Sequence, residues 1–366
     1  MARGMRAGTL GTAAVLAALL VSSGSAAAAQ APRGFYGVVP QADIHAPDLE
    51  RMGAGQVGTV RVTLPWQEID PTPVPGDYLW HEFDQVVAGA SREQITVLPT
   101  IYTVPGWLAR LEGCDDPAGG PCSITPPTTQ FGLSQWRSFI AAAVRRYGPE
   151  GLFWTLNRDL PERPIRAWQI WNEPNSSGFY QPSPSIDRYA DLLVAASESI
   201  RSIDPDASVL LGGLYREGAI DATDFLRGLY ARPGIEAAFD GVAIHPYAGR
   251  MSGVKGQVRR INRVIKSAGD DQVRIWITEI GWASGGRRTP LNRGPRGQAK
   301  RLEQAFRWFT AKRKPLGIEL VAWYAWRDVP LDEFRCRWCA RTGLFPTHSL
   351  EPKPAWARFV AFTGGR

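Results

Sequence analysis

Short runs of β-branched and aromatic residues alternate with amphipathic stretches along most of the chain. The runs have the length and composition of buried strands, whereas the stretches between them repeat their apolar positions with helical spacing. The pattern predicts eight strands, over residues 34–39, 59–64, 96–101, 165–171, 208–214, 241–245, 273–278 and 318–323. It also predicts eight helices, over residues 48–52, 81–93, 131–147, 186–203, 223–231, 254–268, 298–312 and 354–362.

Eight strand–helix units in succession predict an α/β fold, a single (β/α)8 barrel of the TIM type. In such a barrel the functional residues lie at the carboxyl ends of the strands and in the loops that follow them. The loop 102–129 follows a predicted strand, so we expect it to border the site. The loop 148–164 follows a predicted helix, so we expect it at the opposite end of the barrel.

The first residues have the pattern of a secretory signal peptide. Arg3 and Arg6 precede an apolar stretch that ends near Val21, and small residues follow as far as Ala29. A transmembrane anchor is the alternative interpretation, but a membrane-spanning helix needs roughly 20 apolar residues and this stretch is shorter. We therefore expect a signal peptide over residues 1–29, cleavage near Ala29, a secreted mature chain, and one barrel domain over residues 30–366.

Charge gives little support to a nucleic-acid partner. The full chain has a formal net charge of +7, and removal of Arg3 and Arg6 with the signal lowers it to +5. The basic residues are scattered over predicted helices and loops without a polybasic tract, so we expect no binding of nucleic acid. No later segment is apolar enough to span a membrane, so we expect no membrane association. Attraction to acidic polymers is compatible with the positive surplus.

Four cysteines form two closely spaced pairs, Cys114 with Cys122 and Cys336 with Cys339. Secretion favours disulfides, and among the three possible connectivities we expect the two local pairings. A zinc site with four thiolates is the alternative, although the spacing of the first pair is too long for a zinc ribbon.

Two glutamates follow predicted strands. Glu173 lies in the sequence Trp171-Asn172-Glu173-Pro174-Asn175, where a carboxylate between Asn and Pro has no packing role. Glu279 follows the largely apolar run 273–277, although a loop acid that happens to follow a strand is the alternative interpretation. The two are 106 residues apart, or three strand–helix units, so they end the fourth and seventh strands and face the same mouth of the barrel.

Two carboxylates at one barrel mouth match the requirements of glycoside hydrolysis. Retaining enzymes place an acid and a nucleophile about 5–5.5 Å apart, whereas inverting enzymes separate their carboxylates by roughly 6.5–9.5 Å. Asn172, directly before Glu173, adds a hydrogen-bonding group for the sugar 2-hydroxyl. The pattern therefore predicts retaining chemistry.

Other polar residues at strand ends have structural alternatives. Arg61 lies within a predicted strand and would face solvent on an edge strand, but a closed barrel has no edge, so we expect it to bind and ionise a carboxylate. His245 ends a strand and is either a hydrogen-bonded structural residue or part of the site. The spacing of the histidines does not match a metal centre, and no glycine-rich phosphate loop is present, so we expect neither a metal nor a cofactor.

The motifs carried by these residues resemble those of clan A glycoside hydrolases, particularly families 39 and 5. They are W-N-E-P-N at 171–175, I-H-P-Y at 244–247, W-I-T-E-I-G-W at 276–282 and the ending P-K-P-A-W at 352–356. An isolated N-E-P is a modest signal, whereas the three internal motifs in this order and spacing are specific. The resemblance covers essentially the whole predicted mature chain.

The resemblance implies a retaining glycoside hydrolase that cleaves O-glycosidic bonds by double displacement, with a role for each strand-end residue. Glu173 would be the general acid/base and Glu279 the nucleophile. Asn172 would bind the 2-hydroxyl, and Arg61 and Tyr247 would orient Glu279 and keep it ionised. His245 would line the reacting subsite. Trp282 and Trp326 would stack on sugar rings, with Trp326 under the reacting sugar.

Alternatives to hydrolysis stay open at this stage. A catalytically silent carbohydrate-binding barrel would share the fold, but the presence of both glutamates argues against it. A transglycosylase would differ only in whether water or a sugar intercepts the intermediate. The partner we expect is an oligo- or polysaccharide bound by a monomer, and the sequence leaves its sugar and linkage undetermined.

Overall fold

The computed structural model describes Met1 and residues 31–114, 120–330, 336 and 338–366. The predicted signal peptide lies outside the described residues, apart from Met1, and stays a prediction. Residues Ala31–Arg366 form one compact unit.

The sheet is a closed parallel barrel, which confirms the predicted (β/α)8 fold. Each strand pairs in parallel with its neighbours in the order β5-β4-β3-β2-β1-β9-β8-β7-β6, and Leu210 of β5 also pairs with Gly241 of β7 to close the ring. The strands are β1 (Tyr36–Val39), β2 (Thr59–Pro65), β3 (Thr96–Tyr102), β4 (Ala167–Ile170), β5 (Ser208–Leu211), β6 (Leu214–Tyr215), β7 (Gly241–His245), β8 (Arg274–Ile280) and β9 (Ile318–Tyr324).

The eight predicted strands correspond to the eight strand positions around the barrel. One of them, predicted as 208–214, is divided by Gly212 and Gly213 into β5 and β6, and both parts pair with β7. The inward side chains of several strands form a small apolar cluster inside the barrel, which includes Val39, Leu98, Leu210, Leu320 and Ala322. A larger apolar layer lies between the sheet and the surrounding helices.

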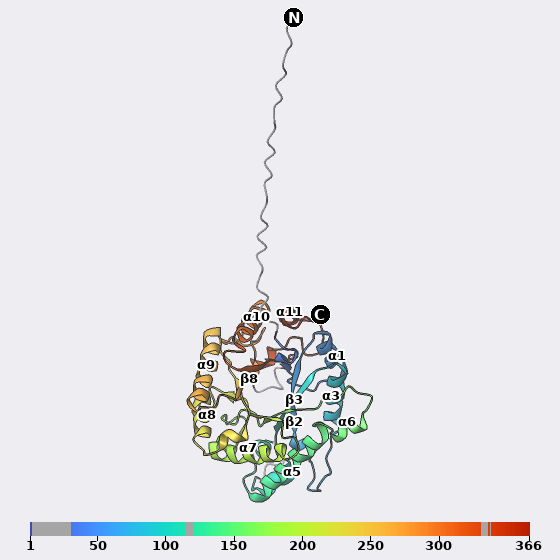
Figure 1. Ribbon diagram of the computed structural model, residues 1–366, viewed down its shortest axis with the longest axis vertical. Coiled ribbons are helices and arrows are strands. Elements are labelled where there is room, and N and C mark those ends of the chain that lie inside the picture. Colours follow the sequence, from blue (N-terminus) through green and yellow to red (C-terminus); the bar gives the residue numbers. More distant parts are fainter. Residues whose placement is uncertain (2–30, 115–119, 331–335, 337) are drawn as a thin grey trace. The chain divides into compact units, whose positions relative to one another are not determined.

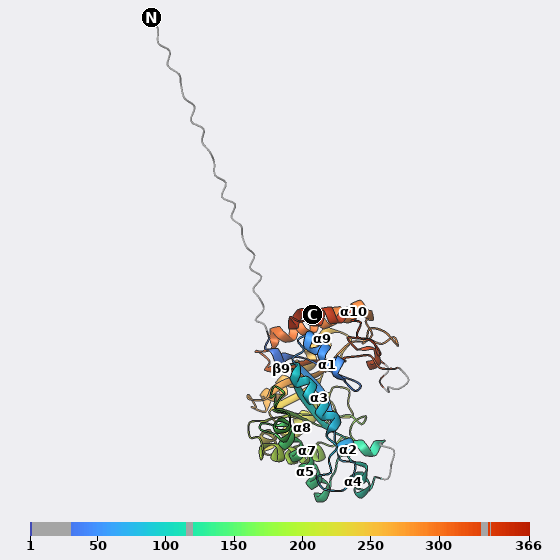
Figure 2. The same cartoon turned by 90° about the vertical axis from the view of Figure 1, so that its right-hand side faces the viewer.

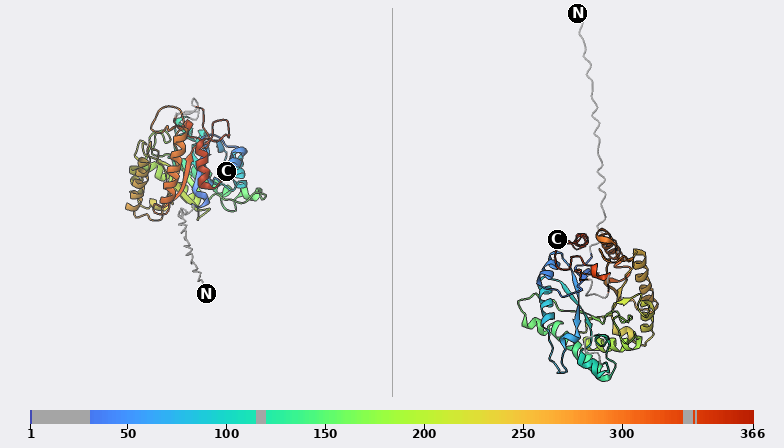
Figure 3. Two further views of the ribbon diagram at one scale, coloured as in Figure 1. Left: turned by 90° about the horizontal axis from the view of Figure 1, so that it is seen from above. Right: turned by 180° about the vertical axis from the view of Figure 1, so that it is seen from behind.

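Helices surround the sheet because each amphipathic segment turns its apolar stripe inward (Figures 1 and 3). All eight predicted helices are present, with ends that differ from prediction by a few residues. They are α1 (Ala46–Ala54), α3 (His81–Arg92), α5 (Gln130–Tyr147), α7 (Ile186–Arg201), α8 (Ala222–Tyr230), α9 (Met251–Ser267), α10 (Gly294–Lys312) and α11 (Pro354–Thr363).

Several short helices in the loops were not predicted. Single helical turns have too few residues to show an apolar period, so their pattern is lost among the loops. Three are α-helical, namely α2 (Trp66–Ile69), α4 (Gly106–Leu111) and α6 (Leu152–Leu156), and four are 3-10 helices, namely Arg33–Phe35, Pro121–Ile124, Ile235–Ala238 and Cys339–Arg341.

The two long loops lie at opposite ends of the barrel, as expected. The loop 102–129 follows β3 and contains α4, which lies beside α2 (Figure 2), with the Trp107 indole donating a hydrogen bond to the Asp70 carbonyl at 3.0 Å. Its described backbone also contacts the loop after β4, where the Gln181 amide donates to Ile124. The loop 148–164 joins α5 to the start of β4 and so lies away from the carboxyl ends of the strands.

Both predicted disulfides are present. Cys114 is bonded to Cys122 and Cys336 to Cys339, with Cα atoms 5.6 and 5.3 Å apart. The four-thiolate zinc site is therefore excluded.

Among the described residues, no helix combines the length and the apolar character that crossing a bilayer requires.

Candidate active site

The loop that carries Glu173 has a strained backbone. Strand β4 ends at Ile170, and the next residues include Trp171 at φ 70° and Glu173 at φ 40°, a region that side chains other than glycine rarely adopt. Such residues cost of order 1–3 kcal/mol each and persist only where the surroundings hold them. The fully buried Asn175 does so, because its amide donates to the carbonyls of Tyr215 and Ile220 and accepts from the Tyr215 amide. The strain therefore coincides with the predicted acid.

Arg61 binds three side chains of the site. It is 5% exposed, and its Nη1 donates to Glu279 Oε1 at 2.8 Å. Its Nη2 donates to Asn172 Oδ1 at 2.8 Å, and its Nε donates to Gln169 Oε1 at 2.6 Å. Because the amide oxygen of Asn172 is occupied by Arg61, its Nδ2 is left as the donor for a ligand.

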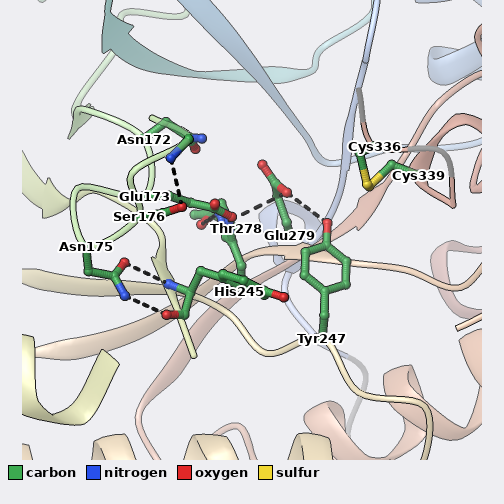
Figure 4. Close-up of polar contacts among 12 residues, drawn as sticks. Asn172, Glu173, Asn175, Ser176, His245, Tyr247, Thr278, Glu279, Cys336 and Cys339 are labelled. Carbon is green, nitrogen blue, oxygen red and sulfur yellow. Dashed lines mark hydrogen bonds and ion pairs between the residues drawn. A yellow bond between two sulfur atoms is a disulfide. The ribbon is translucent and has the colours of Figure 1, made fainter. Parts of the chain in front are cut away.

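His245 lies between the two glutamates (Figure 4). Its Nδ1 is 2.7 Å from Glu173 Oε1 and 3.5 Å from Glu279 Oε2. One carboxylate oxygen of each glutamate and a ring nitrogen of His245 lie within 4.8 Å of one another. The structure therefore brings together the two glutamates that the sequence placed on strands four and seven.

Gly213 makes room for the imidazole of His245. A Cβ atom built on Gly213 would lie 2.0 Å from His245 Nε2, so only glycine fits at this position. This close approach coincides with the interruption between β5 and β6.

Two residues that sequence reasoning missed connect the site internally. Gln169, which is fully buried in β4, accepts hydrogen bonds from Arg61 and from Thr100 Oγ1. Thr278 Oγ1 is 3.1 Å from His245 Nε2 and 3.5 Å from Gln169 Nε2. Polar residues inside otherwise apolar strands were the available signal, because a barrel interior tolerates them only when they are paired.

The aromatic groups at the mouth differ in part from prediction. The Tyr247 hydroxyl donates to Glu279 Oε2 at 2.8 Å (Figure 4). The half-buried Trp338 packs edge-on against Tyr247 with ring centroids 5.0 Å apart, and Tyr324 lies 6.3 Å from Tyr247. Tyr324 is half-buried, and burial together with the charges of both glutamates raises its pKa, a relation to the site that sequence reasoning did not assign to it.

Trp282 and Trp326 are placed in the core, unlike the sugar-stacking positions expected for them. Trp326 is 1% exposed, donates its indole N–H to Asp48 at 2.7 Å and packs against Phe345. Trp282 is fully buried, and its indole donates to the Ala248 carbonyl at 2.8 Å. Neither ring offers a face to a ligand in this structure.

The surroundings shift the pKa values of the two glutamates by different amounts. Burial and the charge of Glu279 raise the pKa of Glu173 well above that of an ordinary glutamate, against the opposing effect of Arg61. Burial also raises the pKa of Glu279, but Arg61 and the hydrogen bond from Tyr247 counteract the rise. Burial and Arg61 lower the pKa of His245 well below its ordinary value, so the imidazole is neutral at neutral pH. Glu173 is therefore the better proton carrier of the pair.

Charge balance supports the same assignment of protons. With Glu173 protonated, Glu279 ionised and His245 neutral, the buried Arg61 balances the cluster, whereas a second ionised carboxylate would add an unpaired buried charge. Glu173, His245 and Glu279 are also close enough together to hold a metal ion. Arg61, at 2.8 Å from Glu279, already provides a positive charge at that carboxylate.

Replacing Glu173 with Gln is expected to stabilise the protein increasingly as the pH rises. A group whose pKa is raised on folding stabilises the folded state fully below its unfolded pKa, and this contribution is lost as the pH rises towards the folded pKa. Glutamine keeps the shape and never ionises, so the variant escapes the loss. Thermal unfolding of Glu173→Gln and wild type between pH 4 and pH 8 should show a widening difference in Tm, about 2 °C for each kcal/mol.

The exposed Glu50 on α1 provides the control for this measurement. Its replacement with Gln also removes one carboxylate, and the gap in Tm between Glu173→Gln and Glu50→Gln should widen as the pH rises. A gap that stays constant would contradict the raised pKa.

Comparison with known proteins is consistent with the geometry. Residues 160–333, which contain Glu173, His245 and Glu279, match a family model described as Glycosyl hydrolase catalytic core. A search of curated protein sequences gave no match to the chain.

Solved structures with the same fold include several glycoside hydrolases. A family 39 glycoside hydrolase from the gut symbiont Bacteroides cellulosilyticus WH2 aligns with a TM-score of 0.66 at 20% identity, over 91% of this chain and 63% of that enzyme. A family 10 enzyme from Paenibacillus barcinonensis aligns at 0.61 with 17% identity, over 91% of this chain and 96% of that one. A glucosidase from Croceicoccus marinus aligns at 0.62 with 13% identity, over 91% and 67%. The chain thus spans less than two thirds of the family 39 enzyme.

The predicted resemblance to clan A and family 39 is thereby confirmed, and family 10 is added to it. Residues 160–333 thus match the glycosyl hydrolase catalytic core model, and the chain has the barrel fold of the family 39 and family 10 glycoside hydrolases.

Proposed function

We propose that the chain is a secreted, monomeric, retaining glycosidase that cleaves an oligo- or polysaccharide by double displacement. The proposal rests on the separation of the two carboxylates. One carboxylate oxygen of Glu173 lies within 4.8 Å of one carboxylate oxygen of Glu279. Retaining enzymes separate these groups by about 5–5.5 Å, whereas inverting enzymes need roughly 6.5–9.5 Å to admit water between them. The two disulfides support secretion, because they persist in oxidising compartments.

In the first step, Glu173 donates its proton to the glycosidic oxygen while Glu279 attacks the anomeric carbon. The C–O bond to the leaving group breaks, and a covalent glycosyl ester forms on Glu279. The raised pKa of Glu173 supports its role as the acid, and the contacts of Arg61 and Tyr247 with Glu279 support its role as the ionised nucleophile.

In the second step, Glu173 removes a proton from water, whose oxygen attacks the anomeric carbon and releases Glu279. The pKa of Glu173 falls once the charge of Glu279 has been consumed in the ester, so the same group can act as a base. His245 stays neutral throughout: its Nδ1 accepts a hydrogen bond from Glu173 when Glu173 is protonated, and in the other tautomer it donates one to the Glu173 carboxylate. We assign binding of the sugar 2-hydroxyl to Asn172, whose Oδ1 accepts from Arg61 and whose Nδ2 donates to no residue in the described part of the chain.

We assign the floor of the reacting subsite to Tyr324 in place of Trp326. Tyr324 extends the inward positions Leu320 and Ala322 of β9, and the charges of both glutamates help to raise its pKa, whereas Trp326 packs in the core. Several structurally similar proteins are xylanases or xylosidases, such as a monomeric β-xylosidase from Caulobacter crescentus CB15. Xylose-containing glycans therefore come first in the panel for finding the substrate.

The stereochemistry of the first product tests the mechanism directly. An aryl glycoside selected from the panel is hydrolysed in an NMR tube, and the anomeric proton of the released sugar is recorded before mutarotation. The anomer formed first should have the configuration of the substrate. Initial formation of the opposite anomer would contradict double displacement and would reassign the pair as an inverting acid and base.

A further inference from the structure

A strongly basic groove lies on the outer surface of the barrel, between α9 and α10, and takes no part in the proposed catalysis. Its volume is about 900 Å³. Figure 1 shows the two helices as neighbours in the helical layer. We call this feature the α9/α10 groove and define it by its six cationic side chains, Arg250, Lys255, Arg293, Lys300, Arg301 and Arg307.

The positive charge of the α9/α10 groove is poorly neutralised by the described protein. Glu303 is the only carboxylate among the described residues that line it, and it is paired with Arg307 at 2.7 Å. Arg250, Lys255 and Lys300 have no ion pair with any described acid. Like charges held together in this way repel one another, so the groove has a positive potential that an anion would relieve.

Two arginines add to the positive potential at the end of the groove where α9 and α10 begin. Arg250 and Arg293 occupy the N-cap positions of α9 and α10, and neither helix has an acidic residue in its first turn. Helix N-termini carry partial positive charge and normally attract acids, so cations there oppose the local stability of both helices. The Nε atom of Arg293 is buried without a hydrogen-bond partner among the described residues. Such a local conflict is expected at a ligand site.

The shape and the lining favour a linear polymer. From Arg293 to Ala311 the groove follows α10 for ~27 Å, at 1.5 Å per residue. The half-buried Trp308 contributes an aromatic surface to the wall, and the Lys255 ammonium lies 5.8 Å from its ring. Aromatic faces stack on sugar rings, and the neighbouring cations fit carboxylate or sulfate groups along a chain.

We propose that the α9/α10 groove binds a strand of anionic polysaccharide at a site separate from the two glutamates. The rim formed by Arg250 and Arg293 follows β7 and β8, so the groove begins at the end of the barrel where the catalytic residues lie. A polymer bound there is held close to the mouth without entering it. The proposal stands independently of the retaining mechanism.

The test compares binding of polygalacturonate with binding of its fully methyl-esterified form, which has the same backbone without the charges. Calorimetry on the wild-type chain at low salt should detect binding of the charged polymer alone, and the binding should weaken as salt rises. The double variant Lys255→Glu with Lys300→Glu should bind about tenfold more weakly or not at all.

A matched control separates the groove from the general charge of the protein. Arg92 on α3 and Arg110 on α4 are exposed and lie outside the groove, so the double variant Arg92→Glu with Arg110→Glu makes the same change in net charge. It should bind polygalacturonate as wild type does, and both double variants should hydrolyse aryl glycosides at the wild-type rate.

The proposal would be overturned if the wild type failed to bind, if it bound the charged and esterified polymers equally, or if both double variants weakened binding equally. Tighter binding of phosphatidylglycerol vesicles or of a DNA duplex than of polygalacturonate would also overturn it, by assigning the groove to another class of partner.

Discussion

The variant Glu279→Ala is expected to fold normally and to lose turnover on aryl glycosides by about 10⁴-fold or more. Alanine removes the atom that attacks the anomeric carbon, so no glycosyl-enzyme forms, and a good leaving group cannot compensate for its loss. The fold should persist because Arg61 keeps hydrogen bonds to Gln169 and Asn172. The measurement is kcat for wild type and variant on the same activated substrate, together with thermal unfolding of both.

Glu319 provides a matched control for this loss. It lies on β9, the strand next to β8, but its side chain is exposed and remote from the mouth. Glu319→Ala should therefore keep the wild-type turnover. Unchanged turnover in Glu279→Ala would refute the nucleophile assignment, and a folded Glu279→Ala that still formed a covalent glycosyl adduct would refute it as well.

The barrel was predictable from the sequence because its elements are long and periodic. Strand and helix patterns alternate eight times, and only a closed parallel sheet arranges so many units without exposed edges. The division of one strand into β5 and β6 was not predictable, because it depends on the contact between Gly213 and His245, which lie on neighbouring strand positions of the barrel. Sequence patterns report local periods and carry no direct information about such approaches.

The charged part of the site was predicted better than its aromatic part. Ionisable residues in apolar strands are costly unless paired, so Arg61, Glu173 and Glu279 stood out in the sequence. Tryptophan is at home both in a core and on a binding surface, so its position alone does not distinguish the two. For Trp326 the strand alternation was the better guide, because the inward positions Leu320 and Ala322 lead to Tyr324.

Gln169 was missed for a different reason. From the fourth strand, its amide oxygen accepts a hydrogen bond from Arg61 and its amide nitrogen donates one to Thr278. A single polar residue in a short strand does not indicate which residues of other strands will surround it. The network it completes fixes the direction of the Arg61 guanidinium, and hence the side of Glu279 that faces the ligand. The reactive geometry thus depends on a residue whose own chemistry is unremarkable.

The variant Glu173→Ala is expected to respond quite differently from Glu279→Ala. Without the acid, glycosides with poor leaving groups should be hydrolysed about 10²- to 10⁴-fold more slowly, whereas highly activated aryl glycosides need little protonation and should still form the glycosyl-enzyme. Its breakdown should then limit the rate, because no base activates water. Added azide needs no base, so it should restore turnover on activated substrates. The measurement is kcat with and without azide across a series of leaving groups.

The configuration of the azide product separates the two roles. In Glu173→Ala, azide attacks the ester on Glu279 from the face that Glu173 occupied, so the glycosyl azide retains the configuration of the substrate. In Glu279→Ala, azide can only replace the missing nucleophile on the opposite face, so any azide product is inverted. Exchange of these two outcomes would exchange the roles of the glutamates, and the absence of azide rescue in Glu173→Ala would contradict its role as acid/base. The raised pKa of Glu173 also predicts a pH dependence. The kcat/KM of the wild type should fall as the pH rises through the pKa of Glu173, because the acid form is lost. This fall at high pH should be absent in Glu173→Ala.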